Sequence, residues 1–172
     1  NKVLNNPKNV ISSGINANSQ FRAIKKFQKE NDLKQTLVLI PKKDYKEEIE
    51  EAFKVSKLNS KKIFYYDTEP TKLTKQIEKV TRYKIRKQNL ADEIKRIENS
   101  EEENKEKILE ILNKRDTLGK IGYDSIIIAD FDESLKSVTT SLLYTDVSPK
   151  NITFISLNQW FDKTLFKETA SQ

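Results

Sequence analysis

The sequence contains no cysteine and no histidine, and these two absences exclude much of the common chemistry of enzyme sites. Without thiols or imidazoles, the chain cannot form disulfide bonds, thiolate or imidazole metal sites, cysteine nucleophiles or histidine-based proton relays. Only three glycines are present, and they lie apart from one another, so no glycine-rich loop can bind the phosphates of a nucleotide. We therefore expect no cofactor, no metal and no enzymatic activity.

Long apolar runs are also missing. No segment approaches the roughly 20 apolar residues that a membrane-spanning helix needs, so we expect no transmembrane segment in this chain. The 172 residues suit a single domain, 1–172, with one substantial core. Because the chain begins at Asn1 and contains no methionine, we expect it to be a piece of a longer precursor.

The formal net charge is +6, which raises nucleic acid as a partner. However, lysine and glutamate alternate along predicted helices such as KKDYKEEIEEAFK, and a DNA-binding surface favours a basic stripe. We therefore expect a solvated surface of mixed charge and no nucleic-acid partner. A DNA-binding module is the weakest of the alternatives for this chain.

Short apolar segments alternate with amphipathic helices along the sequence. The segments predicted as strands are 37–41, 61–66, 125–129 and 151–156. A first helix is predicted from the helical spacing of Phe21, Ile24 and Phe27. Strand and helix alternation is typical of a parallel sheet with helices on both faces. The sequence thus predicts a three-layer α/β sandwich with a Rossmann-like sheet of strand order 2-1-3-4.

Residues 71–115 interrupt this alternation. Their apolar residues follow helical spacing from Leu73 to Ile97 with a slip at Lys87, and a second apolar stripe follows around Ile108. We interpret the segment as an αα-hairpin inserted between the second and third strands. It is either a self-packed decoration or an arm that binds a partner.

Polar residues follow the predicted strands, where parallel sheets hold their ligands. Tyr45, Tyr66 and Asp130 are the candidate ligand-binding residues at this edge. We expect Asp44 and Asp132 to act as helix N-caps, which leaves Asp130 without a capping role. A hydrolase using Asp130 and Asp132 as paired carboxylates is an alternative that nothing else in the sequence supports. Trp160 is expected to be a packing anchor, and a short helix is expected over 163–169.

Four segments resemble type I periplasmic binding proteins in their order along the chain. They are ISSGINANSQFRAIKKF, LVLIPKKDYKEEIEEAF, YDSIIIADFDESL and LLYTDVSPKNITFISLNQW. The second is similar to the strand and Pro-x-x-Asp-Tyr segment that opens the second lobe. Taken with the helical insertion and the final Trp, the order is closer to the penicillin-binding protein activator branch than to amino-acid receptors.

The resemblance covers about residues 10 to 165 and implies that the chain is mainly the second of two lobes. It implies a periplasmic lipoprotein, or a related envelope protein, which contacts a bifunctional peptidoglycan synthase without catalysing a reaction. The alternative is a solute-binding receptor of a transporter for amino acids or similar small anions. The family usually has glycine after the tyrosine of this Asp-Tyr segment, whereas Lys46 stands here, which disfavours close backbone approach by a ligand.

Overall fold

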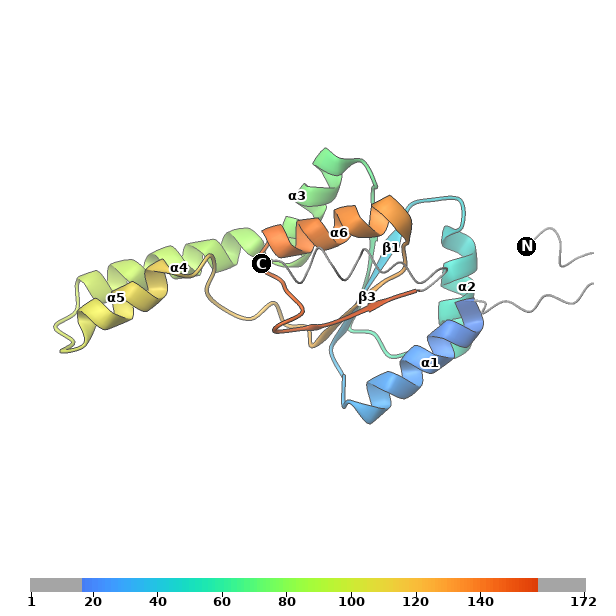
Figure 1. Cartoon of the computed structure of the whole chain (residues 1–172), viewed down its shortest axis with the longest axis horizontal. Helices are drawn as coiled ribbons and strands as arrows, with labels where there is room; N and C mark the ends of the chain where they lie inside the picture. The colour runs from blue at the N-terminus through green and yellow to red at the C-terminus, as the bar shows by residue number, and fades with distance from the viewer. Residues whose placement is uncertain (1–16, 158–172) are drawn as a thin grey trace, which may run out of the picture.

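The computed structural model describes residues 17–157, in which four strands alternate with helices (Figure 1). The elements are α1 Ala17–Glu30, β1 Thr36–Pro41, α2 Lys46–Ser56, β2 Lys62–Tyr66, α3 Pro70–Val80, α4 Tyr83–Glu98, α5 Lys105–Asn113, β3 Ser125–Ile128, α6 Asp132–Tyr144 and β4 Thr153–Ser156. The predicted helix over 163–169 and Trp160 lie outside the described residues.

The four strands form one sheet of order β2-β1-β3-β4, and every pair of neighbours is parallel. Both features confirm the predicted fold class and strand order. In the register, Leu39 of β1 lies beside Phe64 of β2 and Ile128 of β3. All residues of β1 and β3 are buried, and beyond Thr36 and Ser125 both are continuously apolar, as expected for central strands covered on both faces.

Helices cover both faces of the sheet and complete a three-layer sandwich (Figure 1). Alternate residues of β1 divide between two cores because side chains alternate along a strand. Leu37 and Leu39 belong to the core beneath α3 and α6. Val38 and Ile40 belong to the core beneath α1 and α2.

Helix α1 buries a different set of residues from the predicted apolar stripe. Phe21 and Ile24 are buried as expected, but Phe27 is 41% exposed. Gln28 takes the third buried position, where its side-chain amide donates to the hydroxyl of Thr36. The buried face of α1 therefore includes a polar side chain that is hydrogen-bonded to the end of the neighbouring strand.

The two predicted aspartate caps are wrong. A turn in which the Lys46 amide donates to the Lys43 carbonyl (2.9 Å) precedes α2, so Tyr45 and not Asp44 occupies the N-cap position. In α6 the N-cap position is Phe131, and Asp132 is the first helical residue, with a φ of 55°. Neither helix has a side-chain cap.

The helical segment that follows β2 breaks earlier than the slip at Lys87 predicts. Helix α3 ends at Val80 because Arg82 adopts a left-handed conformation with a φ of 56°. Leu73 and Ile77 of α3 are buried in the core beneath α6, so this helix is part of the sandwich. Of the segment 71–115, only α4 and α5 form the hairpin.

The hairpin of α4 and α5 extends away from the sandwich (Figure 1). Its two helices pack on each other through a small core of their own, separate from the cores of the sheet. Leu90, Ile97 and Leu112 are the buried members of this cluster. The predicted αα-hairpin is thereby confirmed for α4 and α5, while a role in binding a partner stays a prediction.

Candidate ligand site at the carboxyl edge of the sheet

The carboxylate of Asp130 is buried just beyond the end of β3. Its Oδ1 atom accepts hydrogen bonds from the Tyr45 hydroxyl (2.7 Å) and the Phe131 amide (2.9 Å). Its Oδ2 atom accepts one from the Tyr66 hydroxyl (2.6 Å). The ammonium of Lys43 lies 3.2 Å from Oδ1 and supplies the opposite charge. Asp130 is therefore fully hydrogen-bonded and paired, as a buried charge must be.

The fold explains why these side chains meet. The chain leaves β1 toward β2 on one side and returns to β3 on the other, so β1 and β3 form the topological switch point of the sheet. Lys43 and Tyr45 follow the end of β1, while Asp130 follows β3. Ligands of open α/β sheets bind beside such a switch point. The three predicted residues Tyr45, Tyr66 and Asp130 are thus brought together, although their binding role stays a prediction.

Both phenols at the site act as hydrogen-bond donors. Burial raises the pKa of Tyr66, and the negative charge of Asp130 raises it further. Burial also raises the pKa of Tyr45, with added effects from the hydrogen bond to Asp130 and the charge of Asp132. Both hydroxyls consequently stay protonated at neutral pH and keep donating to the carboxylate.

Only part of the cluster can be reached by a ligand. Tyr66 and Asp130 are fully buried, while Tyr45 is half-buried and the Lys43 side chain is 29% exposed. The Tyr45 ring packs against Phe131 with centroids 4.8 Å apart. The rim of the site is therefore a cation beside two aromatic rings. Such a rim can hold an anionic or planar group, while Asp130 and Tyr66 hold the rim in place.

Two members of the cluster were missed by the sequence argument. Lys43 also donates to the hydroxyl of Ser134, in the first turn of α6. The available signal was a lysine two residues beyond the end of a buried strand, but lysines are too frequent in this chain to single it out. Ser134 gave no signal, because a serine in the first turn of a helix is ordinary.

The geometry gives no support to paired-carboxylate catalysis. Asp130 accepts hydrogen bonds at both oxygens, and Asp132 is exposed in a strained left-handed conformation. Among residues 17–157, no group of three or more acidic side chains is arranged to hold a metal ion. The described cluster is thus built to fix side chains in position.

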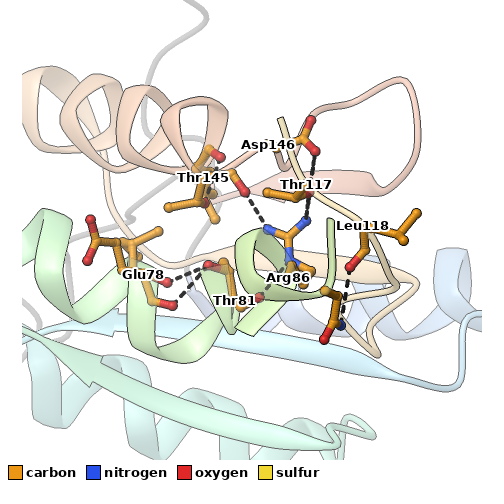
Figure 2. A network of polar contacts seen from close by, with 10 residues as sticks. Glu78, Thr81, Arg86, Thr117, Leu118, Thr145 and Asp146 are labelled. Atoms are coloured by element: carbon orange, nitrogen blue, oxygen red, sulfur yellow. Dashed lines mark hydrogen bonds and ion pairs between the residues drawn. The ribbon is translucent and has the colours of Figure 1, made fainter. Parts of the chain in front are cut away.

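A second buried polar network joins the hairpin to the sandwich (Figure 2). The guanidinium of Arg86 donates through Nε to the Thr81 carbonyl (3.1 Å) and through Nη1 to the Thr117 hydroxyl (2.9 Å). Its Nη2 atom donates to the carbonyl of Thr145, at the end of α6. The Asp146 carboxylate lies 4.0 Å from Nη1 of Arg86 and accepts a hydrogen bond from the Thr117 hydroxyl.

This arginine fixes the base of α4. The Arg86 side chain is 5% exposed, and burial lowers its pKa, although the charge of Asp146 partly offsets that effect. The backbone carbonyl of Arg86 accepts a hydrogen bond from the Leu118 amide (3.0 Å), which brings the two ends of the hairpin together. The sequence indicates this role, because helical spacing places Arg86 on the same buried face of α4 as Tyr83 and Leu90.

No protein-family model, curated protein or solved structure matches this chain. Across residues 17–157, none of the helices has both the length and the apolar character required to cross a membrane.

Proposed function

We propose that this chain acts by protein–protein contact and not by catalysis, as a lobe resembling activators of peptidoglycan synthases. The contact element is the hairpin of α4 and α5. The observation that supports the proposal is the projection of this hairpin beyond the sandwich on a base held by buried Arg86 (Figures 1 and 2). A hairpin that served only to cover the cores of the sheet would be expected to pack against them.

The surface of the hairpin suits a protein partner. Ile111 of α5 is 56% exposed and Ile85 of α4 is 49% exposed, although both helices have already buried an internal stripe. Ion pairs also lie on the surface of the hairpin, such as the one between Arg96 and Glu93 (2.9 Å). Exposed apolar side chains together with polar and charged ones are the usual composition of a protein contact surface.

The polar cluster at the sheet edge supports the non-enzymatic part of the proposal. Asp130, the one carboxylate there without solvent exposure, already accepts four hydrogen bonds from protein groups. A general base must have a free lone pair directed at a substrate, and a nucleophile must be accessible. The cluster supplies a rigid frame for the strand ends.

Deleting the hairpin tests the proposal. Replacing residues 87–115 by a short Gly-Ser linker retains Arg86 and all of α3, and the hydrogen bond between Leu118 and Arg86 shows that the joined ends lie close together. A deletion starting at Lys72 would instead remove buried Leu73 and Ile77 from the core. We expect the shortened chain to stay folded, which cooperative thermal unfolding would show. It should nevertheless lose binding to the bifunctional peptidoglycan synthase of the same organism, measured by biolayer interferometry. Undiminished binding by the folded deletion variant would refute the proposal.

A solute receptor is the second candidate function. It is favoured by the position of the partly exposed Lys43 and Tyr45 at the topological switch point. An amino acid that binds there raises the unfolding midpoint by mass action, and the substitution Tyr45→Phe should reduce the shift. A thermal-shift screen against amino acids separates the two functions, since a contact protein is indifferent to all of them.

A further inference from the structure

Helix α1 carries a basic stripe that the overall charge alternation of the sequence conceals. Its cationic residues follow helical spacing along one flank, beside the buried face of Phe21 and Ile24, and they are Arg22, Lys25, Lys26 and Lys29. Glu30 is the only acidic residue of the helix. Helix α2, by contrast, carries both signs, with four glutamates in its first six residues.

A surface depression of about 490 Å³ lies beside this stripe. All four cations of the stripe line it, together with Lys34 from the connection to β1, whereas Asp32 is the single acidic residue of its lining. The volume is within the range of small-ligand pockets. The depression therefore combines concave shape with a concentrated positive charge.

Hydrogen bonds between segments hold the walls of the depression in place. The side-chain amide of Gln28 donates to the Thr36 hydroxyl and to the Asn59 carbonyl (3.3 Å). The ammonium of Lys25 donates to the Ser56 carbonyl (3.1 Å), which ties α1 to the end of α2. The depression is a fixed feature between three segments of the chain.

The cations of the depression are only weakly neutralised by the protein itself. The pair of Lys26 with Glu30 (3.7 Å) and the pair of Lys34 with Asp32 (2.8 Å) both have side chains more than half exposed. Exposed ion pairs contribute little free energy and exchange readily for other partners. An incoming anion can therefore recruit these ammonium groups.

We propose that this depression binds a phosphate-bearing anion. A phosphate group offers several strong acceptor oxygens and a high charge in a small volume, which suits five cations around one pocket. The guanidinium of Arg22 can bind it through paired hydrogen bonds, and the lysines supply point charges. The phosphate comes either from a soluble polyphosphorylated molecule or from a lipid headgroup, since both present the same chemistry.

Titration of the 172-residue chain tests this binding site. Sodium tripolyphosphate in isothermal titration calorimetry represents the soluble source, and sedimentation with phosphatidylglycerol vesicles represents the lipid source. The variant Arg22→Gln/Lys29→Gln alters two exposed side chains and should weaken binding of whichever probe is recognised by about tenfold. Binding should also weaken as salt is added.

The matched control is Lys84→Gln/Lys95→Gln, which removes two exposed charges from α4 and should bind like the unmodified chain. Binding of tripolyphosphate alone assigns the site to soluble ligands, and vesicle binding alone assigns it to lipid. The inference is overturned if neither probe binds at about 1 mM, or if both variants weaken binding equally. Tighter binding of polyglutamate than of tripolyphosphate would also overturn it, in favour of an acidic protein segment.

Discussion

The hydroxyl of Tyr66 lies 2.6 Å from Oδ2 of Asp130, and this hydrogen bond spans the end of the central strand β1. Tyr66 is the last residue of β2, and Asp130 follows β3, so the bond joins the two strands that flank β1. Both side chains are fully buried. The pair fixes the relative position of three strand ends and of the loops that leave them.

Removing the Tyr66 hydroxyl should destabilise the fold without removing a ring from the core. The substitution Tyr66→Phe leaves Oδ2 of a buried carboxylate short of a donor, which costs about 2 kcal/mol of unfolding free energy. Urea denaturation followed by circular dichroism measures the loss. The neighbouring substitution Tyr65→Phe is the control, because Tyr65 is 37% exposed, and it should have little effect. Equal losses in the two variants would contradict the assigned role.

Neutralising Asp130 should cost more than removing one of its partners. In the Asp130→Asn variant the Lys43 ammonium loses its counter-ion, and the amide nitrogen of asparagine is brought against groups that donate hydrogen bonds to the carboxylate. We therefore expect the free energy of unfolding to fall by about 3 kcal/mol. The control is Asp132→Asn, at an exposed position whose left-handed conformation asparagine tolerates. Chemical denaturation of both variants measures the difference. A stable Asp130→Asn variant would show that the carboxylate is not needed to hold the strand ends.

Two arginines of α4 should differ sharply in their contribution to stability. The substitution Arg86→Met leaves the carbonyls of Thr81 and Thr145 without their donor, so we expect a loss of about 3 kcal/mol. It should also speed amide hydrogen exchange at the base of α4. Arg96→Met removes an exposed arginine paired with Glu93 and should change neither measurement. Unchanged exchange in the Arg86 variant would mean that this residue does not anchor the hairpin.

The acid limb of the stability curve should depend on Asp124. Burial alone would raise the pKa of its carboxyl group, but hydrogen bonds from the Gln35 amide, the Ser125 hydroxyl and the Lys34 amide lower it overall. Because the folded-state pKa lies below the unfolded value, the group stabilises the fold above the ordinary pKa of 3.8. That contribution disappears as the pH falls through the lowered pKa.

Urea midpoints measured from pH 6 down to the acid transition test this dependence. The Asp124→Asn variant should be less stable at neutral pH and should lose less stability on acidification than the unmodified chain. Asp116→Asn changes an exposed aspartate beside the hairpin and should leave the curve unaltered. Parallel curves for the Asp124 variant and the unmodified chain would exclude this carboxyl group as the cause.

The sequence predicted the sheet well because its strands are short apolar runs with clear ends. Residues 37–40 and 126–128 are apolar without interruption, as strands covered on both faces must be. The convergence of Tyr45, Tyr66 and Asp130 followed from the same pattern, since parallel strands end at one edge. These predictions needed only periodicity and topology.

Features set by single backbone conformations could not be predicted in the same way. Arg82 and Asp132 adopt left-handed conformations that are more usual for glycine. Their identity therefore did not indicate that α3 ends at Val80 or that Asp132 does not cap α6. Lys43 was hidden among many lysines, and the stripe of α1 was hidden by averaging charge over the chain. The role of Lys43 depends on tertiary contacts, and the stripe depends on the arrangement of charges on one face of a helix.

The most direct test of protein contact through the hairpin compares two substitutions at equally exposed apolar residues. Ile111 of α5 is 56% exposed and Val55 of α2 is 53% exposed, so a lysine at either position is solvated and should leave the fold intact. Biolayer interferometry with the bifunctional peptidoglycan synthase should show binding weakened by about tenfold for Ile111→Lys and unchanged for Val55→Lys. Unaltered binding by the Ile111 variant, or an equal loss in both, would contradict the assignment of the hairpin as the contact element.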